Sequence, residues 1–257
     1  MPEGITRAVW AFCWGLAAAS GVLGGTVLGL TARLPHRASA ATMSFGAGLL
    51  LSAASLSPKI ASEALIVAGA VYTTGGIITG AAMFSIANAA LPGAKDRKRC
   101  GECKAQISEA EAPGTGTTIA LATALDAVPK ALLLGITLRV SGPDVPLMAV
   151  ALALSNVSES VSATTGMRLA SRSSAYVVSL WVGIALGTAV MTAVTFHLLR
   201  DIGPDLRATL KAFGAGALVA MTAETIIPEA FHNGPRFSGV LAASGFAVLI
   251  LLSEVLK

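Results

Sequence analysis

Long stretches of apolar residues, separated by short polar segments, run through the whole chain. A helix that crosses a bilayer needs about 20 mostly apolar residues. Eight stretches meet this length: Val9–Leu30, Ala38–Leu56, Leu65–Leu91, Thr117–Leu138, Leu147–Leu169, Ala175–Leu199, Leu210–Ile227 and Phe237–Leu256. The pattern therefore predicts an all-α polytopic membrane protein, in which residues 1–257 form a single domain of eight transmembrane helices.

The composition narrows the choice of protein class. Hydrophobic residues make up 54% of the chain and charged residues 12%, and the mean hydropathy is +0.74. A soluble domain carries about 25% charged residues, so a soluble enzyme, a disordered protein and a nucleic-acid-binding protein are excluded. The 27 glycines suit helices that pack closely in lipid. The lipid bilayer is therefore an expected partner, and nucleic acid is not.

Basic residues in the polar segments predict the orientation, because cytoplasmic loops are enriched in Lys and Arg. The segments after the first, third, fifth and seventh spans hold ten of these residues, whereas the opposite side holds seven. We therefore expect those four segments in the cytoplasm of a multi-pass protein of the cell membrane, with both termini extracytoplasmic.

One polar segment, residues 92–116, is much longer than the others. Its basic start and its Gly- and Thr-rich end bury little apolar surface, so we expect a mobile cytosolic loop between the third and fourth spans. The loop contains Cys100 and Cys103, spaced as Cys-x-x-Cys. A structural zinc site needs four ligands. The pair is therefore either reduced and unliganded or part of a metal-handling loop.

Two motifs occur twice in the chain. Residues 45–50 (Phe-Gly-Ala-Gly-Leu-Leu) resemble residues 213–218 (Phe-Gly-Ala-Gly-Ala-Leu), which relates the second span to the seventh. A weaker match joins residues 126–130 (Asp-Ala-Val-Pro-Lys) to residues 155–159 (Ser-Asn-Val-Ser-Glu), in the fourth and fifth spans. These matches predict a 3+2+3 arrangement of inverted repeats, a plan that many transporters use around a midplane site.

Ionisable residues enter the membrane in the fourth and fifth spans, where they are costly and are functional candidates. Asp126 and Lys130 lie one helical turn apart and share a face. Ser155, Asn156 and Glu159 share a face of the fifth span. If the two faces meet, one buried cluster combines two carboxylates, an amide, a hydroxyl and an ammonium.

Pro129 adds an acceptor to this cluster, because it cannot donate to the carbonyl of Leu125. Two interpretations of the cluster remain. It is either an ion-binding site or a buried network of Asp126, Lys130 and Glu159 that only holds the bundle together.

In their order along the chain, these motifs resemble the ZIP family of divalent-metal transporters. Residues 126–131 and 155–160 are similar to the family motifs of the fourth and fifth spans, and residues 45–48, 213–216 and 226–230 are also family-like. The resemblance implies alternating access, often in a homodimer. In that process the first, fourth, fifth and sixth helices move against the other four. It also implies metal ligands and transport-pathway residues in the central pair of helices: the ligands Asp126, Ser155, Asn156 and Glu159, and the pathway residues Lys130 and Pro129.

The chain departs from the family pattern at important positions. Lys130 stands where the family usually has a metal-bridging Glu, and Ser158 stands where it has a Pro. With the family Glu the site would carry three carboxylates and a charge of −3. With Lys130 it carries two carboxylates and one ammonium, and a charge of −1. Divalent cations prefer dense carboxylate and imidazole ligation, so this site is expected to bind metal more weakly.

The resemblance implies a ZIP-like transporter that moves a divalent metal cation (zinc, iron or manganese) toward the cytoplasm through the midplane site. The alternative is a transport-inactive ZIP-like protein with a Lys-neutralised site and a binding or regulatory role. In a third interpretation the protein is a transporter of a different substrate, and Lys130 selects an anion or a small solute. The chain carries no catalytic motif, so we expect neither an enzyme nor a prosthetic group.

Overall fold

The computed structural model describes residues 3–32, 35–55, 66, 69–91, 115–140, 144–232 and 234–255. Every regular element in these ranges is helical. The elements are α1 (Glu3–Thr31), α2 (His36–Ser55), α4 (Gly69–Ala90), α5 (Thr115–Val140), α6 (Asp144–Leu169), α7 (Ser174–Leu198), α8 (Pro204–Met221), η2 (Thr222–Ile226), α9 (Ile227–His232) and α10 (Ser238–Val255).

Eight helices in this part of the chain are long and apolar enough to cross a membrane, which confirms the all-α, multi-pass interpretation. Most ends lie within a few residues of the expected ones. The seventh span is longer, because α8, η2 and α9 form one continuous stretch, Pro204–Phe231. Helix α5 begins at Thr115, inside the expected loop 92–116. The rest of that loop, with Cys100 and Cys103, lies outside the described residues.

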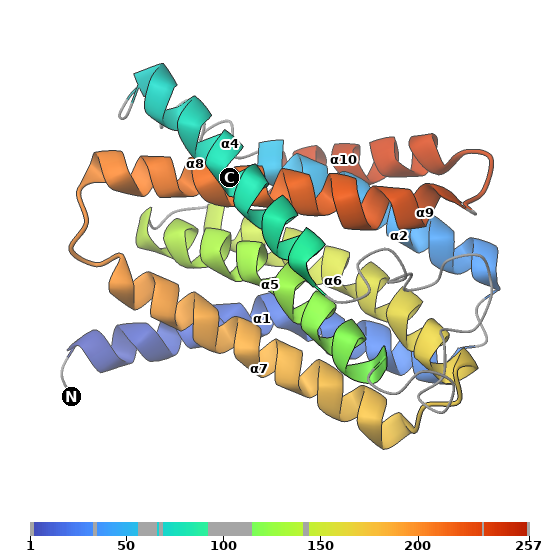
Figure 1. Ribbon diagram of the computed structural model, residues 1–257. Coiled ribbons are helices and arrows are strands. Elements are labelled where there is room, and N and C mark those ends of the chain that lie inside the picture. Colours follow the sequence, from blue (N-terminus) through green and yellow to red (C-terminus); the bar gives the residue numbers. More distant parts are fainter. Residues whose placement is uncertain are drawn as a thin grey trace.

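The helices pack as two groups of four spans. Helices α1, α5, α6 and α7 contact one another. In the second group, α10 packs on α2, α2 packs on the span formed by α8, η2 and α9, and that span packs on α4. The main contacts between the groups are α2 with α6 and α5 with α8. The chain reverses direction between successive spans, so the α1–α2, α6–α7 and α9–α10 connections lie at one end of the bundle and the α7–α8 connection at the other (Figure 1).

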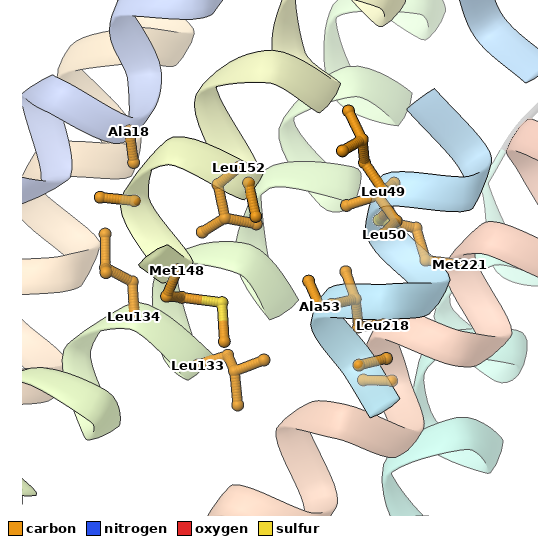
Figure 2. Close-up of a cluster of buried hydrophobic side chains, with 14 of the residues drawn as sticks. Ala18, Leu49, Leu50, Ala53, Leu133, Leu134, Met148, Leu152, Leu218 and Met221 are labelled. Atoms are coloured by element: carbon orange, nitrogen blue, oxygen red, sulfur yellow. The ribbon is translucent and has the colours of Figure 1, made fainter. Parts of the chain in front are cut away.

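A hydrophobic core lies where α2, α5, α6 and α8 meet, with side chains from all four helices pointing toward one another (Figure 2). Its largest buried members include Leu49, Leu50, Leu133, Leu134, Leu152, Leu218 and Met221. Polar residues in the central spans therefore have a packed apolar core on the side that faces α2 and α8.

Glycines allow close contact between α1 and α6. A Cβ atom at Gly21 would overlap the carbonyl of Ala153, and one at Gly25 would overlap Ser160 Oγ. The two glycines are four residues apart, so they share one face of α1. This spacing lets two transmembrane backbones approach each other.

The contact between α2 and α10 uses glycines in a reciprocal way. Gly48 of α2 lies against the carbonyl of Ala242, and Gly245 of α10 lies against the carbonyl of Phe45. A Cβ atom at either glycine would overlap backbone atoms of the other helix.

In the contact between α8 and α4, a glycine of each helix again lies against a backbone carbonyl of the other helix. Gly216 of α8 lies against the carbonyl of Ile77, and Gly80 of α4 lies against the carbonyl of Phe213. In both interfaces a Phe-Gly-Ala-Gly motif supplies its phenylalanine carbonyl and its second glycine. The partner helix supplies a carbonyl and a glycine three residues later.

Candidate functional site

The candidate site lies where the middle parts of α5 and α6 face each other. Lys130 is close to the middle of the span Ala120–Arg139, and Glu159 is close to the middle of Val145–Leu169. Both side chains are buried, with 3% and 5% of the residue exposed. A charge at this depth is costly unless it is paired, so the pairing of these two groups determines what the site can bind.

The ammonium of Lys130 is held by three oxygens of α6. Lys130 Nζ donates to Glu159 Oε1 at 2.6 Å, to Glu159 Oε2 at 2.7 Å and to Asn156 Oδ1 at 2.9 Å. Charge-assisted hydrogen bonds of this length are the strong ones in proteins. The ammonium thus occupies the place in which a cation bound by Glu159 and Asn156 would lie.

Two further hydrogen bonds hold the α6 side of the site in position. Ser155 Oγ donates to Glu159 Oε1 at 3.0 Å, and Asn156 Nδ2 donates to the carbonyl of Ala18 in α1 at 2.9 Å. The second bond fixes the amide so that its oxygen points at the ammonium. Four of the predicted residues, Lys130, Ser155, Asn156 and Glu159, are therefore in direct contact.

The other two predicted residues lie on α5 beside this network. Asp126 is 3% exposed and lies one turn before Lys130, and it also takes part in a polar interaction. Pro129 is buried inside α5. Because proline has no backbone N–H, the carbonyl of Leu125 lacks its usual donor one turn later. That carbonyl is a further oxygen at the level of the site.

A small cavity of about 20 Å³ borders Lys130, Asn156 and Glu159. This volume is sufficient for about one water molecule. Sequence reasoning did not identify the residues that complete its wall, because hydroxyls and rings in apolar helices give no distinctive pattern. These residues are Val22, Thr123, Ala127, Trp181, Ile184 and Thr188.

A larger groove of about 740 Å³ runs between α5 and α7. Its lining is mostly apolar and includes Leu121, Val128, Gly183 and Gly187. Ala127, Ile184 and Thr188 line both the groove and the small cavity. The polar cluster is therefore separated from the groove by little more than these three side chains.

The donor set of the site is sparse for a metal ion. In the described ranges, no group of three or more His, Cys, Asp or Glu side chains is placed to hold a metal. Glu159 and Asn156 offer oxygens that face a single point, but Lys130 already uses them. A metal ion could use these oxygens only if the ammonium moved away.

Glu224 lies in the π-helical turn η2, and its partners were not apparent from the sequence. Its carboxylate accepts hydrogen bonds from Ser85 Oγ and from Asn88 Nδ2 (3.1 Å), both on α4. Pro228, which has no N–H, follows this turn, and the lost donor favours the wider helical turn. Glu224 thus joins α4 to the α8 span and takes no part in the central cluster.

The chain matches none of the protein-family models and none of the curated proteins with which it was compared.

Proposed function

We propose that the chain is a ZIP-like membrane transporter that moves a divalent metal cation toward the cytoplasm, with the α5–α6 cluster as its binding site. The observation that carries the proposal is the buried, ionisable cluster of Lys130, Asn156 and Glu159 at mid-span. Groups of this kind inside a membrane protein usually serve an ion or proton pathway.

The helix contacts support the inverted repeats that this proposal needs. In a 3+2+3 inverted repeat, α1 corresponds to α7, α2 to the α8 span, α4 to α10, and α5 to α6. Each contact should then have a counterpart between the corresponding helices. The contact of α1 with α6 has its counterpart in that of α7 with α5, and the contact of α4 with α8 has its counterpart in that of α10 with α2. The contact of α2 with α6 likewise corresponds to that of α8 with α5, and each of the smaller contacts also has such a counterpart. Such a contact pattern is expected of a 3+2+3 repeat.

The two Phe-Gly-Ala-Gly motifs support the same relation at the level of single residues. Phe45 and Gly48 make the same backbone contacts with α10 that Phe213 and Gly216 make with α4. The same reciprocal contact is not expected at two unrelated helix interfaces. The packing groups also agree with the two sets of helices that move against each other in the ZIP-like scheme.

Charge balance gives Lys130 a role in transport. With Asp126 and Glu159 ionised and Lys130 protonated, the cluster has a net charge of −1. Adding a dication would raise the charge to +1, whereas adding it with loss of the lysine proton would give zero. A buried net charge is unfavourable. Cation entry should therefore expel one proton from Lys130, so cation binding is favoured at higher pH.

A second function is favoured by the same hydrogen bonds. Because Lys130 satisfies both oxygens of Glu159, the site is complete without metal. A transport-inactive ZIP-like protein with a binding or regulatory role would have this arrangement permanently.

Uptake of labelled zinc, iron(II) and manganese separates the two functions. Cells that lack their own importers would carry the wild type, Asp126→Asn, Glu159→Gln or an empty vector, at two external pH values. The transporter proposal expects uptake above the vector, an increase at higher pH, and loss in both variants. Uptake equal to the vector at both pH values and for all three metals would favour the transport-inactive protein.

A further inference from the structure

Four arginines gather at the end of the bundle where α5 and α7 end and α8 begins. The guanidinium of Arg139, in α5, lies over the ring of Phe196, in α7, with Cζ 4.4 Å from the ring centroid. The charge of Arg139 also interacts with those of Arg7, Arg200 and Arg207. These residues belong to α1, the α7–α8 connection and α8, so the arginine cluster (Arg7, Arg139, Arg200 and Arg207) brings together four parts of the chain.

The described acidic side chains nearby do not neutralise the arginine cluster. Arg200 Nε lies 3.8 Å from Asp201 Oδ1, and the two side chains are 61% and 92% exposed. Such an exposed pair contributes little. Asp205 lies in the first turn of α8 and is exposed. Among the side chains that the structure describes at this end, four guanidinium groups thus lie near two exposed carboxylates, which leaves an excess of positive charge.

The start of α8 lies beside Arg207 of the arginine cluster. Gly203 is the N-cap residue and provides no side-chain hydrogen bond. Arg207 Nη2 donates to the carbonyl of Ile202 at 3.0 Å, which places the guanidinium beside the helix start, and its buried Nε has no hydrogen-bond partner. Free N–H groups and the dipole at a helix start favour an anion.

Aromatic rings next to the arginine cluster are positioned as in a membrane–water interface. The ring of Trp10 lies 6.3 Å from that of Trp14 and 6.1 Å from that of Phe196, and Trp10 is 43% exposed. Arg7 lies one turn before Trp10, near the beginning of the span Thr6–Thr31. Tryptophans collect at the headgroup level of a bilayer. At this depth a bilayer presents the phosphates of its lipids.

We propose that the arginine cluster binds the phosphodiester headgroup of an anionic phospholipid, whose acyl chains pack beside Trp10. Arginine suits this ligand, because its planar guanidinium forms paired hydrogen bonds with phosphate oxygens. The arginine cluster joins α1, α5 and the connection that follows α7 to the first turn of α8, which belongs to the other packing group. A bound headgroup would therefore hold the two groups of helices together at this end. The proposal does not depend on what the protein transports.

Lipid binding to the purified, delipidated protein in detergent tests the proposal. The thermal unfolding midpoint would be followed against phosphatidylglycerol, phosphatidylcholine or inorganic phosphate. We expect phosphatidylglycerol alone to raise the midpoint with saturation, and we expect its apparent affinity to fall as salt is added. Equal stabilisation by phosphatidylcholine, or protection by inorganic phosphate at the same concentration, would overturn the assignment to an anionic lipid.

Variants locate the binding site. The double variant Arg139→Gln/Arg200→Gln removes two charges but keeps the backbone contact of Arg207, and it should weaken the affinity for phosphatidylglycerol at least about tenfold. The control Arg37→Gln removes an exposed arginine from the opposite end of the bundle and should leave the affinity within about twofold. An unchanged affinity in the double variant would contradict the proposal. If that variant does not fold, the lipid and salt series on the wild type decides.

Discussion

Helices α5 and α6 have similar places in the pattern of helix contacts, yet they carry opposite charges at the two positions that a weak sequence match aligns. The weak match of residues 126–130 with 155–159 aligns Lys130 with Glu159, and these are the two residues that pair. If both positions held a carboxylate, the two acids would face each other in the apolar interior and would need a cation or a proton between them. One substitution thus distinguishes a site that requires a metal ion from a site that is complete without one.

The two helices also differ in their surroundings. On α6, Ser155, Asn156 and Glu159 are all buried and joined by hydrogen bonds. On α5, Leu121 and Val128 face the groove shared with α7 and are 49% and 41% exposed. The α6 half of the site is therefore fixed by its neighbours, whereas the α5 half has free space beside it. If one side of the ion pair moves, we expect it to be Lys130.

The largest expected effect comes from Lys130→Glu, which gives both helices a carboxylate. Without metal, loss of the ammonium should lower the free energy of unfolding by about 3–5 kcal/mol, the usual cost of breaking a buried ion pair. Zinc or manganese should restore stability, because a ligand of the native state shifts unfolding by mass action. Thermal unfolding with and without a chelator measures both effects.

The matched control is Lys130→Met, which also removes the ammonium but offers no oxygen ligand. It should be destabilised without becoming metal-dependent. If the chelator has the same effect on Lys130→Glu and Lys130→Met, position 130 does not contribute to a cation site.

The next effect tests the equivalence of α5 and α6 directly. The double variant Lys130→Glu/Glu159→Lys restores one ammonium and one carboxylate at exchanged positions. If the positions are equivalent, the double variant should regain more than half of the roughly 3–5 kcal/mol lost in the single variants. The measurement is a double-mutant cycle of thermal or denaturant unfolding. Additive losses would show that the two helices are not interchangeable at this point.

Sequence reasoning predicted the eight spans well, because each span is a continuous apolar stretch whose length is fixed by the bilayer. It also placed Asp126 with Lys130 on one helix face and Asn156 with Glu159 on another, since helical spacing fixes which residues share a face. That the two faces meet was a condition of the prediction, and the hydrogen bonds of Lys130 fulfil it. It could not predict that Lys130 binds both oxygens of Glu159, or that Asn156 is anchored on Ala18. Those contacts depend on the rotation and separation of the helices, which no spacing rule supplies.

A smaller effect compares the two Phe-Gly-Ala-Gly motifs at their glycine contacts. Gly48→Ala and Gly216→Ala each place a methyl group on a backbone carbonyl of the partner helix. Overpacking of this kind costs about 1–3 kcal/mol, and the two variants should lose similar amounts of stability. Unfolding of both variants under the same conditions gives the comparison. A large loss in one and none in the other would count against equivalent α2–α10 and α8–α4 interfaces.

The smallest effect concerns glycines that face open space. No atom lies within 4 Å of a Cβ atom built at Gly183 or Gly187, which line the groove beside α5. Alanine stabilises a helix interior by up to about 1 kcal/mol relative to glycine. Gly183→Ala should therefore leave the unfolding midpoint unchanged or slightly raised, whereas Gly21→Ala, at the α1–α6 contact, should lower it. A clear loss of stability in Gly183→Ala would mean that something beyond the described residues occupies the groove and needs close access to α7. The same unfolding experiment in detergent and in bilayer discs would then distinguish a contact within the chain, which appears in both, from a lipid or a second copy, which appears only in the bilayer.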